Sequence, residues 1–307
     1  MENIKHFTNM LHENAKILVL GSNGQLGTAL RNISTQYTDK IFVFADRNDI
    51  DITDHKLVDF IIYHNPDFII NCAAYTAVDL AETETLVADQ VNHQACQWIV
   101  EGASKTDSVV LHVSTDYVYH INPSRPLLEN DKCTPAGVYA TTKYLGEQVI
   151  STYPKHIILR TSWVYSNTGK NFYKTMLQLS TKKALTIVAD QYGAPTYAND
   201  LADACLQIVC HIDGAKHISS NFGIYNFSNE GCITWYDFAK TIFDLHQLDL
   251  DLQKTTTKAY NAPAERPLWS VLSRQKIKKN FNLTVPHWLD GLKRCVIENS
   301  ELIKSNI

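Results

Sequence analysis

Short apolar runs alternate with longer helix-like stretches through the first half of the chain. Apolar runs of only three to five residues, rich in Val, Ile and Leu, predict buried strands. Such strands, separated by helices, are typical of a parallel sheet that is covered on both faces. We therefore predict a doubly wound α/β (Rossmann) fold. The expected strands are residues 16–20, 41–44, 68–70, 109–113 and 156–159, and the expected helices run to about 33 and over about 54–65, 84–104 and 138–152.

The second half of the chain shows a looser pattern. Beyond about residue 166 we expect helices at about 172–183 and 199–210, strands at 185–188 and 224–227, and then two shorter helices. This predicts a smaller lobe beside the sheet, and leaves open whether it returns elements to the sheet. We divide the chain into a dinucleotide-binding domain, residues 15–165, and a mainly substrate-binding lobe, residues 166–307. Residues 1–14 are expected to form a helical or frayed extension.

The composition argues against several classes of partner. With 45% hydrophobic and 20% charged residues and a formal net charge of −4, the chain gives no electrostatic reason to bind nucleic acid or an acidic membrane surface. No window approaches the roughly 18 apolar residues that cross a bilayer. The seven cysteines show no zinc or redox spacing, and the histidines show no ligand spacing, so we assign no metal-binding residues, and whether a divalent ion is needed stays open. Reduced thiols favour a cytoplasmic protein.

A glycine-rich turn joins the first strand to the first helix. Gly21, Gly24 and Gly27 follow the strand at a Gly-x-x-Gly-x-x-Gly spacing. Glycines there let the backbone approach a pyrophosphate, while the start of the helix supplies N–H groups and a positive dipole. We expect a dinucleotide site formed by Gly21, Asn23, Gly24, Gln25, Leu26 and Gly27.

Two residues after the second strand point to different cofactors. Asp46 would accept hydrogen bonds from a ribose 2′-OH and favours NAD, whereas Arg47 would pair with a 2′-phosphate and favours NADP. We expect NADPH, with NADH as the alternative. A solvated loop without a cofactor role is the structural alternative.

A tyrosine and a lysine lie four residues apart in the helix expected after the fourth strand. Tyr139 and Lys143 would share one helix face, where a phenol can protonate a carbonyl oxygen as hydride reaches its carbon. We expect Lys143 to lower the pKa of Tyr139 and to reach the nicotinamide ribose. Thr115 follows the fourth strand, at the edge where parallel sheets bind ligands, and could donate to the same oxygen.

These motifs together resemble the extended short-chain dehydrogenases/reductases. More specifically, the chain is similar to the dTDP-4-dehydrorhamnose reductase family from about Lys16 to Leu292. The resemblance rests on five separated motifs in one order: residues 24–27, 71–79, 114–118 and 159–165, and Arg266-Pro267 with Ser270.

The resemblance implies a role for each candidate residue. Tyr139 would be the proton donor with Lys143 as its partner, and both would touch the cofactor. Thr115, Asp116 and Trp163 would contact the 4-keto hexose of a dTDP-sugar, and Arg266 its nucleotide part. Further cofactor contacts would be Asp51, Ile52, Ala73, Ala74 and Tyr75, and Asn92 would be structural. Ordinary alternatives are a core position for Trp163, a turn cap at Asp116 and a surface turn at Arg266.

Related activities share the same fold. A 4,6-dehydratase would resemble Thr-Asp-Glu where this chain has Thr115-Asp116-Tyr117, and epimerases usually read Gly-Phe-Ile-Gly where it has Gly24-Gln-Leu-Gly27. Both differences favour a reductase. Another sugar-nucleotide reductase or epimerase, or a non-catalytic NADP-binding regulatory subunit, remains an alternative. The oligomeric state, monomer or homodimer, stays open.

Overall fold

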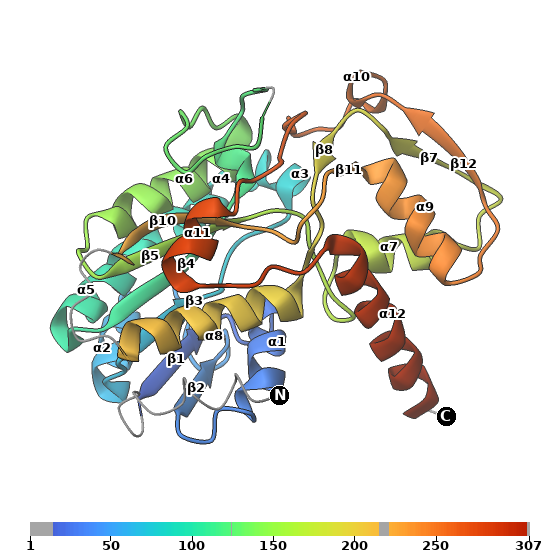
Figure 1. Cartoon of the computed structure of the whole chain (residues 1–307). Helices are drawn as coiled ribbons and strands as arrows, with labels where there is room; N and C mark the ends of the chain where they lie inside the picture. The colour runs from blue at the N-terminus through green and yellow to red at the C-terminus, as the bar shows by residue number, and fades with distance from the viewer. Residues whose placement is uncertain (1–14, 124, 215–220, 306–307) are drawn as a thin grey trace.

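A parallel sheet forms the centre of the larger of two lobes (Figure 1). The computed structural model describes residues 15–123, 125–214 and 221–305, so the expected N-terminal extension lies outside the described residues. Within these ranges, six parallel strands form the sheet in the order β10-β5-β4-β3-β1-β2. They are β1 (Lys16–Leu20), β2 (Ile41–Ala45), β3 (Phe68–Asn71), β4 (Val109–Thr115), β5 (His156–Thr161) and β10 (Gly223–Phe227). The predicted doubly wound fold is confirmed.

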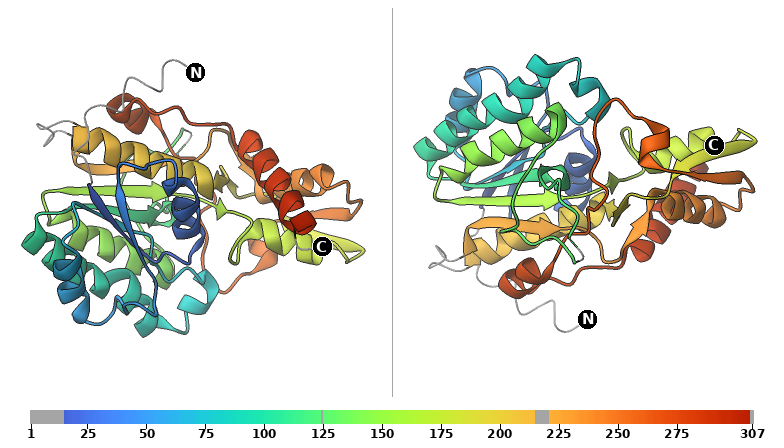
Figure 2. Two further views of the ribbon diagram at one scale, coloured as in Figure 1. Left: turned by 90° about the horizontal axis from the view of Figure 1, so that it is seen from below. Right: turned by 90° about the horizontal axis from the view of Figure 1, so that it is seen from above.

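Helices cover both faces of the sheet, as Figure 2 shows. The alternation of side chains along β1 explains the two layers, because Ile17 and Val19 face one hydrophobic cluster while Leu18 and Leu20 face the other. The first layer holds α1 (Gln25–Ser34), α8 (Ala198–Gly214) and α11 (Gln275–Phe281). The second holds α2 (Lys56–His64), α5 (Ala95–Thr106) and α6 (Gly137–Ser151).

The helix expected over 84–104 is interrupted by a wider turn. Short helices α3 (Val78–Ala81) and α4 (Thr85–Asp89) lead into a π-helix, Gln90–Gln94, which continues as α5. A Cβ added at Gly146 of α6 would overlap the carbonyl oxygen of Asn92 in that π-helix. The backbones of α6 and of the π-helix are therefore in direct contact. Such π-turns occur frequently at functional sites.

A second lobe has its own hydrophobic core. It contains α7 (Phe172–Leu179), α9 (Trp235–Leu245), α10 (Thr257–Tyr260), α12 (Trp288–Ser305) and the parallel pair β7 (Ala184–Val188) and β12 (Asp251–Thr255). Small pairs join β6 (Val164–Tyr165) to β9 (Thr196–Tyr197), and β8 (Tyr192–Gly193) to β11 (Ile233–Thr234). The prediction of two shorter helices was wrong, because α9, α10, α11 and the 18-residue α12 all follow β10. The segment around residues 256–275 is largely polar, so the ends of the helices in and after it could not be predicted from the sequence.

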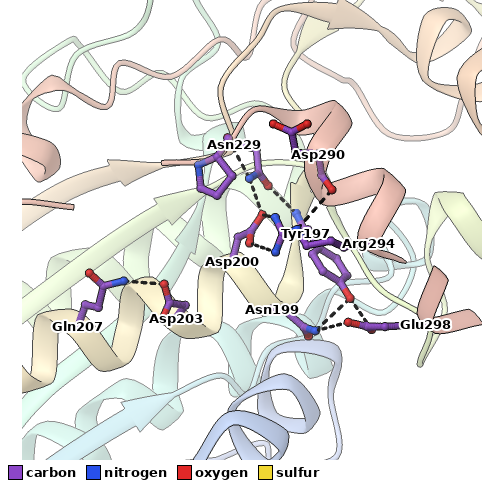
Figure 3. Close-up of polar contacts among 10 residues, drawn as sticks. Tyr197, Asn199, Asp200, Asp203, Gln207, Asn229, Asp290, Arg294 and Glu298 are labelled. Atoms are coloured by element: carbon purple, nitrogen blue, oxygen red, sulfur yellow. Dashed lines mark hydrogen bonds and ion pairs between the residues drawn. The ribbon is translucent and has the colours of Figure 1, made fainter. Parts of the chain in front are cut away.

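Polar contacts tie α12 to the start of α8 (Figure 3). The Arg294 guanidinium donates two hydrogen bonds, at 2.7 and 2.8 Å, to the carboxylate of Asp200, which is also bonded by the Asn229 amide at 2.6 Å. One turn further along α12, Glu298 accepts hydrogen bonds from Tyr197 and Asn199. These contacts fix the two lobes to one another.

A search of the described helices for a membrane span found none with the length and apolar character that a bilayer requires.

Candidate functional site

The glycine turn is shaped to receive an anionic group. Gly21 has φ +77°, and a Cβ there would lie 2.6 Å from the backbone nitrogen of Ala73. At Gly27 a Cβ would lie 2.5 Å from the carbonyl oxygen of Gly21. Helix α1 begins after Gly24 with no side-chain cap and no acidic residue in its first turn. Its first N–H groups are therefore open to a ligand, which fits the pyrophosphate of a dinucleotide.

The end of β2 lies beside this turn. Asp46 accepts a hydrogen bond from the Asn23 side chain and another, at 2.6 Å, from the backbone N–H of Asn48. Arg47 is 88% exposed and lies 3.4 Å from Asp51. Asp51 accepts two bonds from Thr53, at 3.0 and 2.8 Å, and these bonds lower its pKa. The carboxylate of Asp46 is thus already engaged by two donors, while the exposed guanidinium of Arg47 has one long contact, to Asp51 at 3.4 Å.

The side chain of Gln25 points away from the turn and toward the second lobe. Its carbonyl oxygen accepts hydrogen bonds from Asn171 at 2.7 Å and from Ser166 at 3.0 Å. Of the expected cofactor residues, Gln25 can therefore offer a ligand its backbone N–H, but its side chain is occupied. Leu26 is buried in the first core cluster, and Ile52 packs against the second.

The loop after β3 is held rigid from both sides. The Asn71 side chain accepts from the N–H of Ala73 at 3.1 Å and contacts His112 at 3.0 Å. Asn92 accepts from the N–H of Tyr75 at 2.8 Å and donates to its carbonyl oxygen at 3.1 Å. The loop of Ala73, Ala74 and Tyr75 therefore lies fixed beside Gly21. Asn92 acts on the backbone, as the resemblance implies.

Tyr139 and Lys143 lie one turn apart on α6. The buried Lys143 ammonium donates to the carbonyl oxygen of Val113 at 2.8 Å, and burial lowers its pKa. Burial raises the pKa of Tyr139 to about 12; the nearby Asp116 also raises it, and a hydrogen bond with Thr115 lowers it. The expected lowering by Lys143 is not found, because that ammonium is directed to β4 instead. Thr115, which the sequence places at the strand end, is the neighbouring group that opposes the rise of the Tyr139 pKa.

A buried carboxyl group lies beside these residues. Asp116 begins the 3₁₀ turn Asp116–Val118, is 2% exposed, and accepts from the Thr115 hydroxyl at 3.1 Å. Burial raises its pKa to about 6, and the facing Ser270 hydroxyl opposes this shift. Its second oxygen, Oδ2, makes no hydrogen bond of normal geometry within the described residues. A buried acceptor at the carboxyl end of β4 suits a polar ligand.

Two aromatic contacts near the site were not predicted from the sequence. The ring of Tyr117 meets that of Tyr139 edge to face, with centroids 5.5 Å apart. Trp163, at φ +49°, stacks on Trp235 with centroids 3.6 Å apart, and a Cβ at Gly193 would lie 2.7 Å from its indole. Trp163 is therefore sandwiched and half-buried between the lobes. Because Trp235 lies 72 positions further along the chain, no local pattern shows this stack.

Arg266 lies where the second lobe meets the loop after β3. Its guanidinium donates to Asp79 at 2.8 Å and to the Ala264 carbonyl oxygen at 3.0 Å. It also lines a cavity of about 270 Å³ together with Gln191, Thr257, Lys258, Tyr260 and the 261–265 segment. Asp79 belongs to a motif that the sequence singles out, but its partner could not be predicted.

The fold and this site define a Rossmann-type, dinucleotide-dependent oxidoreductase. The chain belongs to the family described as the RmlD substrate binding domain, whose model matches residues 15–301. The dTDP-4-dehydrorhamnose reductase of Aggregatibacter actinomycetemcomitans is 39% identical over 289 residues, covering 91% of this chain and 97% of the relative.

Solved structures agree with the sequence comparison. A dTDP-4-dehydrorhamnose reductase from Bacillus anthracis, in complex with NADP, superposes with a TM-score of 0.86 at 31% identity and covers 93% of this chain and 99% of its own. A dTDP-4-dehydrorhamnose reductase from Clostridium acetobutylicum gives 0.87 at 32% identity, with the same coverage.

Proposed function

We propose that this protein reduces the 4-keto group of dTDP-4-dehydro-L-rhamnose to give dTDP-L-rhamnose, with NADPH as reductant and NADH as the alternative. The observation that carries the proposal is the cluster of Thr115, Tyr139 and Lys143 at the carboxyl end of β4, beside an open pyrophosphate turn. Relatives matched over nearly their whole length carry this activity in their names.

The residues divide into two sets around the reacting carbon. The proposed cofactor set comprises Gly21, Asn23, Gly24, Gln25, Leu26, Gly27, Asp46, Arg47, Asp51, Ile52, Ala73, Ala74 and Tyr75, with Tyr139 and Lys143. The proposed substrate set comprises Thr115, Asp116, Trp163 and Arg266. Residues 15–165 would bind the dinucleotide and residues 166–307 mainly the sugar nucleotide, although β10 and α8 of the second segment pack into the first.

The chemistry needs a hydride at C4 and a proton at its oxygen. The nicotinamide supplies the hydride when it is bound. Tyr139 donates its phenolic proton to the oxygen, and the bond C=O becomes CH–OH. Thr115 opposes the rise of the Tyr139 pKa, and its hydroxyl proton, now donated to Asp116, would lower the cost of a charged Tyr139 by turning to the phenolate oxygen until solvent reprotonates it. Lys143, one helical turn from Tyr139 and bonded to the Val113 carbonyl oxygen, would contact the nicotinamide ribose.

The direct test follows cofactor oxidation with freshly generated dTDP-4-dehydro-L-rhamnose and identifies the product. Loss of NADPH with the appearance of dTDP-L-rhamnose supports the proposal. Tyr139→Phe is expected to lower kcat by roughly 10²–10⁴-fold, the usual contribution of general acid catalysis, with NADPH binding unchanged. Tyr144→Phe, on the same helix, is the matched control. Binding of NADPH without turnover would favour a regulatory subunit instead.

Location and assembly follow from less specific observations. We infer a cytoplasmic enzyme, since all seven cysteines are free thiols. For the assembly we propose a monomer or homodimer, which sedimentation of the purified protein would distinguish.

A further inference from the structure

An ion pair joins α3, which follows the loop after β3, to the second lobe. The Arg266 guanidinium donates to Asp79 Oδ2 at 2.8 Å, and the other carboxylate oxygen, Oδ1, accepts from the backbone N–H of Ala264 at 3.1 Å. Asp79 lies in α3, directly after the loop that follows β3, and the two partners are 187 residues apart. One carboxylate thus fixes both the backbone and the side chain of the segment 264–266.

The same segment lies beside the catalytic residues. Arg266 and Asp79 both act on the pKa of Tyr117, whose ring contacts Tyr139 edge to face. Ser270, four residues further on, faces Asp116. Residues 264–266 therefore lie close to Tyr117 and, through the ring of Tyr117, to Tyr139.

Arg266 keeps unused binding capacity while it is held. A guanidinium has five N–H donors, and in the described part of the chain Asp79 and the Ala264 carbonyl oxygen use two of its nitrogens. The remaining donors belong to a residue that lines the cavity of about 270 Å³, where Lys258 adds a second positive charge and Glu265, which contacts His120 at 3.0 Å, a negative one. Such a fork suits the two phosphates of a nucleoside diphosphate.

We infer that Asp79 is a positioning residue for sugar-nucleotide binding. It holds Arg266 and the 264–266 segment in place, so that the free guanidinium donors meet the diphosphate of the substrate. The inference rests on the proposed function for the identity of the substrate. Asp79 itself does not touch the reacting atoms and acts through Arg266.

The test compares three substitutions of Asp79 under steady-state conditions. Asp79→Asn keeps an acceptor for Ala264 but loses the charge; we expect KM for the sugar nucleotide to rise about 10-fold, with kcat and the Kd of NADPH within 2-fold of wild type. Asp79→Ala should raise KM further, and Asp79→Glu should restore part of the loss. Glu101→Gln is the matched control, because Glu101 forms an exposed ion pair with Lys105 outside the site.

A second measurement separates this inference from the proposed function. Calorimetric titration with dTDP alone needs no turnover, and Asp79→Asn should weaken dTDP binding about 10-fold. If wild-type protein binds dTDP but reduces no dTDP-4-dehydro-L-rhamnose, the proposed function fails while the titration still tests Asp79. Unchanged dTDP affinity in Asp79→Asn would overturn the inference. So would an equal loss of NADPH affinity, which would indicate a general structural role.

Discussion

Arg160 and Glu147 form a buried, two-pronged ion pair between β5 and α6. Arg160 donates from Nε at 2.9 Å and from a terminal nitrogen at 2.6 Å, and the two side chains are 2% and 0% exposed. The same guanidinium donates to the Tyr119 hydroxyl at 2.6 Å. The pair therefore holds α6, which carries Tyr139 and Lys143, against the sheet.

Removing one partner of this pair should destabilise the protein strongly. Glu147→Ala leaves the Arg160 charge buried and uncompensated, so we expect the free energy of unfolding to fall by about 3–5 kcal/mol. Denaturant titration measures it. Asp244→Asn, which breaks an exposed pair with Lys240, should change it by less than about 1 kcal/mol. Equal effects of the two substitutions would contradict this account.

Two glycines of the pyrophosphate turn should differ in their tolerance of alanine. Gly21→Ala meets both a positive φ of +77° and the Ala73 backbone at 2.6 Å, so we expect NADPH affinity to be lost. Gly24→Ala places its Cβ 3.3 Å from the Gly21 carbonyl oxygen at an ordinary φ of −73°, and should weaken binding much less. Fluorescence titration with NADPH compares them. Tolerance of Gly21→Ala would argue against this turn as the binding site.

The raised pKa of Asp116 makes stability depend on pH. Burial raises the pKa of this carboxyl from 3.8 to about 6, so the folded protein binds more protons than the unfolded chain between these values. The contribution of Asp116 is therefore fully present below pH 3.8 and is lost as pH rises through about 6, at most about 3 kcal/mol. Asp116→Asn removes the titration, so its stability relative to wild type should increase between pH 4 and pH 7. A constant difference across that range would contradict the assignment.

Arg47 should decide between the two nicotinamide cofactors. Its side chain is 88% exposed beside the turn, whereas Asp46 is engaged by Asn23. Arg47→Ala should raise KM for NADPH about 10-fold and leave KM for NADH nearly unchanged, since only the former carries a 2′-phosphate. Lys56→Ala, at another exposed cation, is the control. An equal rise in KM for NADPH and NADH would show that Arg47 does not bind the 2′-phosphate.

The strands of the sheet could be predicted from the sequence because each is a short apolar run that is visible without knowledge of its partners. The apolar run in β4 and the glycines after β1 mark local structure that depends on nearest neighbours. The position of Tyr139 and Lys143 one turn apart on one helix could likewise be predicted, because it depends only on their spacing of four residues.

The parts that could not be predicted depend on distant residues. Asp79 meets Arg266, and Trp163 meets Trp235, only after the two lobes have packed. The direction of the Tyr139 pKa also depends on tertiary structure, since Lys143 donates to Val113 instead. Spacing alone says which side chains share a helix face, but not where each one points.

The sixth strand of the sheet also has a consequence for synthesis of the chain. β10 pairs with β5 from residues 223–227, and α8, which covers the same sheet, begins at Ala198. A nascent chain that has emerged only as far as β5 therefore exposes an unpaired strand edge and an uncovered apolar face. Ribosomes add roughly 5–20 residues per second, so this surface stays open for several seconds before its partner emerges. The nucleotide-binding half cannot finish folding as an independent unit, and the nascent chain should depend on chaperones during that interval.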